Sequence, residues 1–190
     1  MCELIELETA RAEALRKLGR NIVNFSKIEG GFKLLLSIGQ VSGTTSTLSS
    51  QVLTNQRRLR KQSLGKLVAK FNKDMMGRSK QAVPPENLSE PWVSLSFTVN
   101  LPGGSNKWKQ SLKSLVAERN QLIHHKLSHL DISSIEDYHE LTGYLDEQNP
   151  RLLAQLDELR WMLESLNEKV NEVRQSPEFL QLLCSLPRER

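Results

Sequence analysis

An arginine, a side-chain amide and an imidazole lie close together in the stretch LKSLVAERNQLIHHKL, residues 112–127. Apolar residues recur there at helical spacing, which predicts a helix with one buried face. Arg119 falls on that face, where a guanidinium is costly unless a partner or a ligand uses its charge. The structural alternative is an arginine at the rim of a core, with its aliphatic stem packed and its head in water.

The spacing of Asn120 and His124 favours a chemical role. These residues are four apart, so they share a helix face and the amide can hold the imidazole. Arg119 and His124 are five apart, about 140° around an ideal helix, so they do not simply stack. The two can share a cleft if the helix loosens near His124, or if a second copy of the helix supplies the facing wall.

The order Arg-Asn-x-x-x-His, formed by Arg119, Asn120 and His124, resembles the signature of the HEPN superfamily (higher eukaryotes and prokaryotes nucleotide-binding domains). The resemblance implies a compact helical bundle that pairs across a two-fold axis. It also implies one composite site built from the arginine and histidine of two subunits. Many members are metal-independent ribonucleases, so an RNA endonuclease without a cofactor is the expected activity.

The residue types fit that chemistry. Histidine titrates near neutral pH, so His124 can take a proton from an RNA 2′-hydroxyl or give one to the leaving oxygen. Arg119 can hold the phosphate with two parallel hydrogen bonds and neutralise the charge that builds on it. The expected product is a 2′,3′-cyclic phosphate. Asn120 is expected to orient His124, and His125 is expected to be a surface residue.

The resemblance allows several biological roles. It is compatible with a toxin or an anti-phage defence nuclease that has an antitoxin or defence protein as partner. Some antitoxin-paired members carry a tyrosine two residues after the histidine, which the partner enzyme modifies, but Lys126 stands at that position here. The alternative is a non-catalytic module that binds nucleic acid or protein. Intact RNA after incubation with a folded dimer would favour that alternative.

Glu29 interrupts an otherwise apolar stripe in the first predicted helical segment, residues 3–38; the stripe consists of Leu15, Leu18, Ile22, Phe25, Phe32 and Leu36. An acid at such a position is expected to pair with a base or to lose its charge. In a catalytic site its expected partner is Arg119 or His124. The alternative is a kink at Gly30 and Gly31 that turns Glu29 to solvent.

Charge is distributed unevenly along the chain, although the net charge is only +4. Residues 57–80 hold nine basic side chains against Asp74, a net of +8, whereas residues 131–175 have a net of −7. A basic helix face attracts phosphate backbones whatever their sequence. The residues predicted to bind RNA on this ground are Arg57, Arg58, Arg60 and Lys61. A solvated face, or a contact with the acidic end of a second subunit, is the alternative.

The periodicity predicts one all-α domain over residues 1–190, an up-and-down helical bundle with a short β excursion. Alternation of apolar and small polar residues at 92–99 predicts a strand in a hairpin or flap, and residues 38–50 are predicted to be a connection. A seam of leucines and valines with 4-3 spacing over residues 152–173 is expected to pack against the first helix. The other expected helices cover 48–76, 112–127, 133–148, 150–175 and a short segment ending near 186.

Composition excludes several classes of protein. With 38% hydrophobic residues and a mean hydropathy of −0.44, the chain fits a soluble globular protein. No apolar run approaches the roughly 18 residues that span a bilayer, and the acidic N-terminus is unlike a signal peptide. Cys2 and Cys184 lack metal-ligand spacing, and no glycine-rich phosphate loop is present. A cytoplasmic protein without metal, cofactor or membrane partner is therefore expected.

Overall fold

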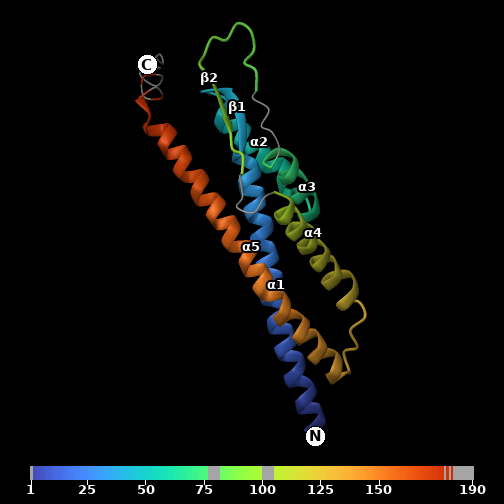
Figure 1. The fold of residues 1–190 in the computed structure, drawn as a ribbon. Helices are drawn as coiled ribbons and strands as arrows, with labels where there is room; N and C mark the ends of the chain where they lie inside the picture. The colour runs from blue at the N-terminus through green and yellow to red at the C-terminus, as the bar shows by residue number, and fades with distance from the viewer. Residues whose placement is uncertain (1, 77–81, 100–104, 178, 180, 182–190) are drawn as a thin grey trace.

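The computed structural model describes residues 2–76, 82–99, 105–177, 179 and 181 (Figure 1). It confirms a mainly helical fold with a short β excursion, a two-stranded antiparallel sheet. The elements in chain order are α1 (Cys2–Ile38), β1 (Gln40–Thr44), α2 (Leu48–Arg60), α3 (Leu64–Asp74), β2 (Trp92–Ser96), α4 (Ser105–Gln121), a π-turn (Leu122–Lys126) and α5 (Ile135–Gln175). None of the described helices has an apolar stretch long enough to cross a bilayer.

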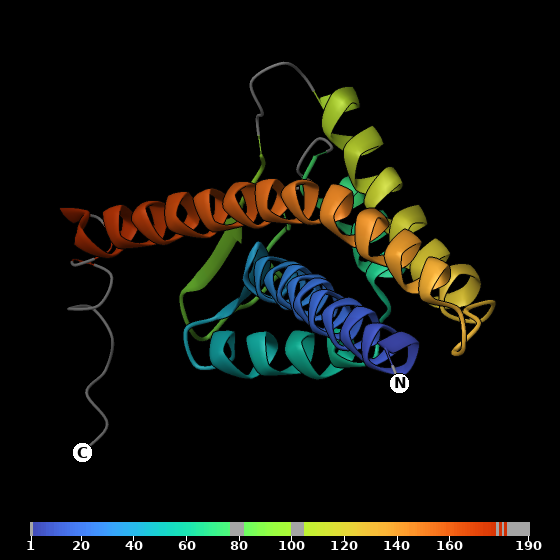
Figure 2. The ribbon, with the colours of Figure 1, turned by 90° about the horizontal axis from the view of Figure 1, so that it is seen from below.

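The two long helices, α1 and α5, lie side by side and run in the same direction (Figures 1 and 2). Lys17, near the middle of α1, pairs with Asp146 in the first third of α5, and Gly31 lies against Leu159 further along both helices. The leucine seam of α5 buries Leu152, Leu159 and Leu166, which confirms packing within the chain. Helix α4 and the π-turn run antiparallel to α5. Trp108 near the start of α4 contacts Glu158, whereas Lys126 at the end of the π-turn contacts Glu140, which is earlier in α5.

An aromatic cluster fixes the first half of α4 in the core. Phe71 of α3 packs against Phe32 of α1 and Trp108 of α4, with ring centroids 5.2 and 5.1 Å apart. The indole N–H of Trp108 donates to the Glu158 carboxylate on α5. Such pairs add to the large apolar area that aromatic rings bury. The helix that carries the Arg-Asn-x-x-x-His motif is therefore anchored to three other helices through Trp108.

Helix α1 is continuous through Gly30 and Gly31, so the expectation of a kink there is wrong. Gly31 has a packing role instead, since a Cβ atom added to it would lie 3.3 Å from a methyl carbon of Leu159. Its lack of a side chain lets α1 and α5 approach closely. Leu15 is another correction, because its side chain is 49% exposed rather than part of the buried stripe.

Helix α5 is one helix of 41 residues that contains Pro150, where a boundary between two helices was expected. A proline removes one backbone donor and distorts the preceding turn. Asn21 and Arg20 of α1 donate to the carbonyl of Leu145 in that turn, at 2.8 and 3.3 Å. These bonds tie α1 to the turn before Pro150, and Figure 2 shows α5 bending along its length. The helix begins after Ser134, whose Oγ accepts from the Asp137 N–H at 3.1 Å, one residue later than expected.

The region between α1 and α4 differs most from expectation. The single helix predicted over 48–76 is two helices, because the backbone turns extended at Ser63 between α2 and α3. The predicted strand forms as β2, and it pairs antiparallel with β1 in the register Gln40↔Ser96 to Thr44↔Trp92. Residues 40–44 were expected to be a connection. The end of the predicted final helix, residues 182–186, lies outside the described residues.

Low pH should destabilise the ion pairs that join α1 to α5 at Asp146. Hydrogen bonds from Lys17 and Arg20 lower the pKa of Asp146, and bonds from Arg16 and Lys17 lower the pKa of Glu13 to about 2. A lowered folded-state pKa contributes stability above the unfolded value, about 4, and this contribution is lost as pH falls through the folded value. The free energy of unfolding in urea should therefore drop below about pH 4.

Asp146→Asn removes part of this dependence, so its unfolding free energy should fall less steeply between pH 5 and 2 than that of the wild type. Glu147→Gln is the matched control, since Glu147 is an exposed neighbour without an ion-pair partner among the described residues. Equal slopes for Asp146→Asn and the wild type would contradict a stabilising role for this network.

Candidate nucleic-acid site at the π-turn

The motif helix changes its winding between Arg119 and His124. Residues Leu122–Lys126 form a π-turn, in which the N–H of Leu127 donates to the carbonyl of Leu122 at 3.1 Å. Each bond here spans five residues rather than four, so the turn holds more residues. Residues five apart consequently lie closer to one face than the 140° of an ideal helix. A loosened helix near His124 was one of the two arrangements that the motif spacing suggested, and the π-turn reduces the angle between the two side chains in that direction.

The motif side chains are open to a ligand. Arg119 is half-buried, whereas Asn120 and His124 are exposed. Within the described part of the chain, neither the Arg119 nor the His124 side chain has a hydrogen-bond or ion-pair partner, and Asn120 does not bond to His124. The guanidinium and imidazole are therefore available to an external anion, while the orienting role expected for Asn120 has no hydrogen bond to support it.

Helix α5 holds the backbone immediately before Arg119. Arg151 pairs with the Glu118 carboxylate through two bonds, at 2.9 and 3.2 Å. The hydroxyl of Tyr144 donates to the backbone carbonyl of Glu118 at 3.4 Å. Burial raises the pKa of Tyr144, so this hydroxyl stays protonated and remains a donor at neutral pH. Two α5 side chains thus fix the residue that precedes the motif arginine.

The same helix holds the far end of the π-turn. Lys126 donates to Glu140 at 2.6 Å, and its ammonium group lies 5.6 Å from the centre of the Tyr144 ring. A cation over an aromatic face adds a modest attraction to the ion pair. Because α5 contacts the chain before Arg119 and after His124, the wide turn is held from both sides.

A series of buried hydrogen bonds connects Tyr144, which contacts the motif helix, to α1. The amide of Gln148 donates to the Tyr144 hydroxyl at 3.4 Å, and the amide of Asn21 donates to the Gln148 carbonyl oxygen at 3.1 Å. Asn21 and Gln148 are fully buried, where unpaired amides would be costly. The position of Tyr144 beside the motif is therefore coupled to the packing of the two long helices.

Glu29 does not join the motif. Its carboxylate pairs with Lys33 at 2.6 Å, one turn further along α1. This i,i+4 pairing neutralises the acid locally, so Lys33 is its partner instead of the expected Arg119 or His124. The structure therefore supports a local structural role for Glu29.

The four predicted RNA-binding residues Arg57, Arg58, Arg60 and Lys61 are exposed at the end of α2, distant from the motif. Helix α2 contacts α1 at Ser37, where the Asn55 amide donates to the backbone carbonyl at 3.4 Å. The π-turn contacts α5 at Glu140, close to the Lys17–Asp146 pair. Twenty residues separate Lys17 from Ser37, which is about 30 Å along α1 at 1.5 Å per residue.

Two lysines that the sequence reasoning did not single out extend the motif face. Lys109 and Lys113 precede Asn120 and His124 on the same helix, and successive members of this set are four, seven and four residues apart. Such spacing places all four on one helix face. Neither lysine has an ion-pair partner among the residues that the structure describes. Extending the predicted helix N-terminally from residue 112 would have revealed this basic track.

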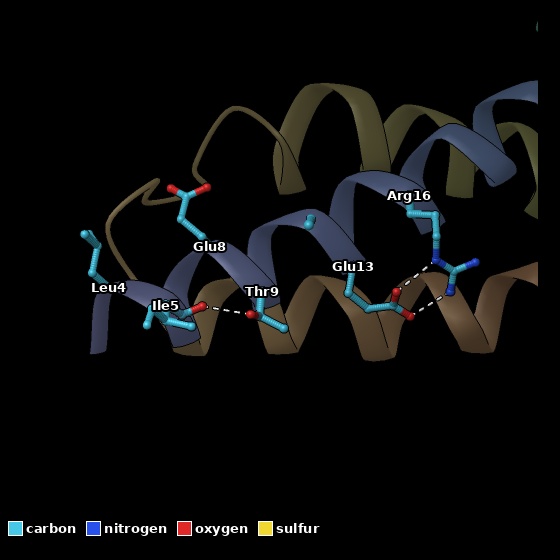
Figure 3. Close-up of a pocket in the computed structure, with 7 residues that line it drawn as sticks. Leu4, Ile5, Glu8, Thr9, Glu13 and Arg16 are labelled. Atoms are coloured by element: carbon cyan, nitrogen blue, oxygen red, sulfur yellow. Dashed lines mark hydrogen bonds and ion pairs between the residues drawn. The ribbon is translucent and has the colours of Figure 1, made fainter. Parts of the chain in front are cut away.

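One hollow on the described surface lies away from the motif, on α1. A groove of about 640 Å³ lies on the outer face of α1 near its start, lined only by residues of that helix (Figure 3). It contains the Glu13–Arg16 pair, with a shortest N–O distance of 2.7 Å. Across the described ranges, no cluster of three or more His, Cys, Asp or Glu side chains could hold a metal ion.

No protein-family model, curated protein sequence or solved structure matches this chain. The likeness to the HEPN signature rests on the spacing of Arg119, Asn120 and His124.

Proposed function

We propose that the chain is a HEPN-like, metal-independent endoribonuclease, a toxin or anti-phage defence component that acts on RNA in the cytoplasm. The observation that carries the proposal is the π-turn at Leu122–Lys126, which begins three residues after Arg119 and contains His124. Its wider winding reduces the angle between the guanidinium of Arg119, which has no bonding partner among the described residues, and the exposed imidazole of His124. Helix α5 holds the chain on both sides of the pair. These two groups are what phosphodiester transfer to a neighbouring hydroxyl requires.

In the proposed reaction, His124 accepts the proton of the 2′-hydroxyl while the 2′-oxygen attacks the adjacent phosphorus. Arg119 binds the non-bridging phosphate oxygens and stabilises the charge that they gain. The bond from phosphorus to the 5′-oxygen breaks, and the leaving oxygen takes a proton from water or from a second histidine. The products are a 2′,3′-cyclic phosphate and a 5′-hydroxyl, and no metal is needed.

A second copy of the chain is the proposed facing wall of the site. His124 is exposed in the single chain, so its imidazole would react in bulk water without cover. A two-fold axis near the π-turn makes one surface serve both subunits. It also sets the Arg119 of one subunit near the His124 of the other. An antitoxin or defence protein would act by covering the same surface.

The direct test is incubation of total RNA with the purified protein in the presence of a chelator, beside Arg119→Ala. Fragments ending in a 2′,3′-cyclic phosphate with the wild type alone support the proposal. Intact RNA with a correctly folded dimer would refute it, and would favour the non-catalytic binding or assembly module instead.

The lysine track should set much of the salt dependence of RNA binding. Each phosphate contact on a single strand contributes about 0.7 to the slope of log K against log salt. Replacing Lys109 and Lys113 with Gln should therefore reduce that slope by about 1.4 in a fluorescence titration. The α2 variant with Arg57, Arg58, Arg60 and Lys61 changed to Gln should weaken binding to longer RNA that also reaches α2.

Lys27→Gln with Lys169→Gln is the control for charge, because both lysines are exposed on other helices. This control pair should leave the slope close to that of the wild type. An unchanged slope in the Lys109 and Lys113 variant would show that these two lysines do not contact the RNA phosphates. Unchanged binding by the α2 variant at low salt would assign that surface to a protein partner or to solvation.

A further inference from the structure

A cleft of about 290 Å³ with both polar and apolar walls opens beside the π-turn, between the turn and the first turns of α5. Gln121, His125, His129 and Glu140 line its sides. Leu130 and Leu141 supply apolar surface, and Leu141 is buried. The volume is at the small end of the range for ligand pockets, which suits a single planar ring system better than a larger ligand.

The cleft adjoins the motif through the chain itself. Gln121 directly follows Asn120, and His125 directly follows His124. Gln121 and His125 are therefore on the helix face next to that of Asn120 and His124. A nucleotide whose phosphate lies at Arg119 and His124 has its base within reach of this neighbouring face.

Hydrogen-bonding capacity in the cleft is only partly used. Glu140 accepts from Lys126 through Oε1, while its Oε2 has no bond among the described residues. The exposed amide of Gln121 also lacks a partner there. Asp137, by contrast, is occupied, because its two oxygens accept from the Asp131 N–H and the Ser134 hydroxyl. The free groups are thus one carboxylate oxygen and one amide with both an acceptor and donors.

Two imidazoles complete the lining. His129 is fixed by its Nδ1, which bonds to the His125 backbone carbonyl at 2.8 Å. The His125 side chain is exposed and has no hydrogen-bond partner within the described ranges. Unstacked RNA bases characteristically stack on aromatic side chains, histidine included, while their edges meet polar groups.

We propose that this cleft binds an unpaired nucleobase that carries an exocyclic amino group, next to the phosphate bound at the motif. The amino group of adenine, cytosine or guanine can donate to Glu140 Oε2 and to the Gln121 carbonyl oxygen. Uracil has no amino group on that edge and presents the single N3–H donor between two carbonyl oxygens. It can therefore make only one hydrogen bond to these two acceptors, and it places a carbonyl oxygen beside the carboxylate. The cleft therefore selects against uracil at one position of the RNA. This inference rests on the proposed function for the placement of the phosphate.

Binding of short fluorescent oligonucleotides to the His124→Ala variant tests the base preference without cleavage. Oligoadenylate and oligocytidylate should bind about tenfold more tightly than oligouridylate, the discrimination expected of one good pair of base contacts. Gln121→Ala in the same background should reduce that ratio toward one. Gln110→Ala is the matched control, since Gln110 is exposed on α4 and does not line the cleft.

The outcomes separate this inference from the ribonuclease proposal. Equal binding of the three oligonucleotides, no binding of any, or an unchanged ratio in Gln121→Ala with a native circular dichroism spectrum would each overturn the base site. Cleavage of RNA without base preference would leave the ribonuclease standing and remove the base site. A base preference that depends on Gln121, in a protein that leaves RNA intact, would do the reverse.

Discussion

Arg119→Ala and His124→Ala should each lower the rate of RNA cleavage by about 10²–10⁴, the usual contribution of one positioned acid–base or charge-stabilising group. The physical reason differs between the two. Loss of His124 leaves the 2′-hydroxyl without a base, whereas loss of Arg119 leaves the charge on the phosphate without compensation. The measurement is the single-turnover rate on a labelled RNA in chelator.

Both variants should keep the fold, which makes the result interpretable. Neither side chain has a hydrogen-bond or ion-pair partner in the described structure, so their removal breaks no internal polar bond. The thermal unfolding midpoint should therefore stay close to that of the wild type. His139→Ala and Arg174→Ala are matched controls, because both residues are exposed on α5 outside the site. Full activity of His124→Ala would exclude the imidazole from the reaction.

Mixing the two inactive variants should restore cleavage. In a two-fold dimer with composite sites, one subunit of a heterodimer supplies Arg119 and the other supplies His124. Half of the randomly paired dimers then carry one of the two normal sites, so activity should recover to about a quarter of the wild-type rate. Because each variant alone should have at most about one hundredth of the wild-type rate, the mixture should be far more active than either variant.

The recovery should require exchange of subunits, so it should appear only after dilution and remixing or brief unfolding and refolding. Arg119→Ala mixed with Arg119→Ala, His124→Ala is the control, since no pairing of these chains restores the arginine. Sedimentation showing only monomers at micromolar concentration, together with intact wild-type activity, would contradict the two-fold site.

The sequence predicted the helical class and the motif helix because their signals are local. Apolar spacing identifies the buried faces of α1 and α5, and these faces do pack on one another. Pro150 was expected to open a new helix because proline is common at a first helical turn. In the structure α5 continues through it and packs on α1 on both sides, at Leu145 and at Leu159, which are contacts with residues far away in the chain. Strand β1 was missed since Val41 is its only large apolar residue, and small residues fill the rest.

For the candidate site, too, the sequence predicted the local features and not those that depend on distant residues. The spacing of Arg119 and His124 showed that an ideal helix separates them, and it named a loosened helix as one remedy. The position of the π-turn depends on contacts from Tyr144, Arg151 and Glu140, which belong to a helix further along the chain. Glu29 was assigned a distant partner although Lys33 stood four residues away, the simpler pairing on a helix.

The pairing of α1 with α5 also determines when the chain can fold during its synthesis. The bond from Asn21 to Leu145 joins residues 124 positions apart, so the first helix emerges from the ribosome long before its main partner exists. At about 5–20 residues per second the wait is roughly 6 to 25 s. During that interval the apolar face around Phe25 and Ile28 lacks its cover from α5. Chaperones that bind exposed apolar helices should therefore bind nascent chains of this protein. The helices should pack fully only after the C-terminal half has left the ribosome.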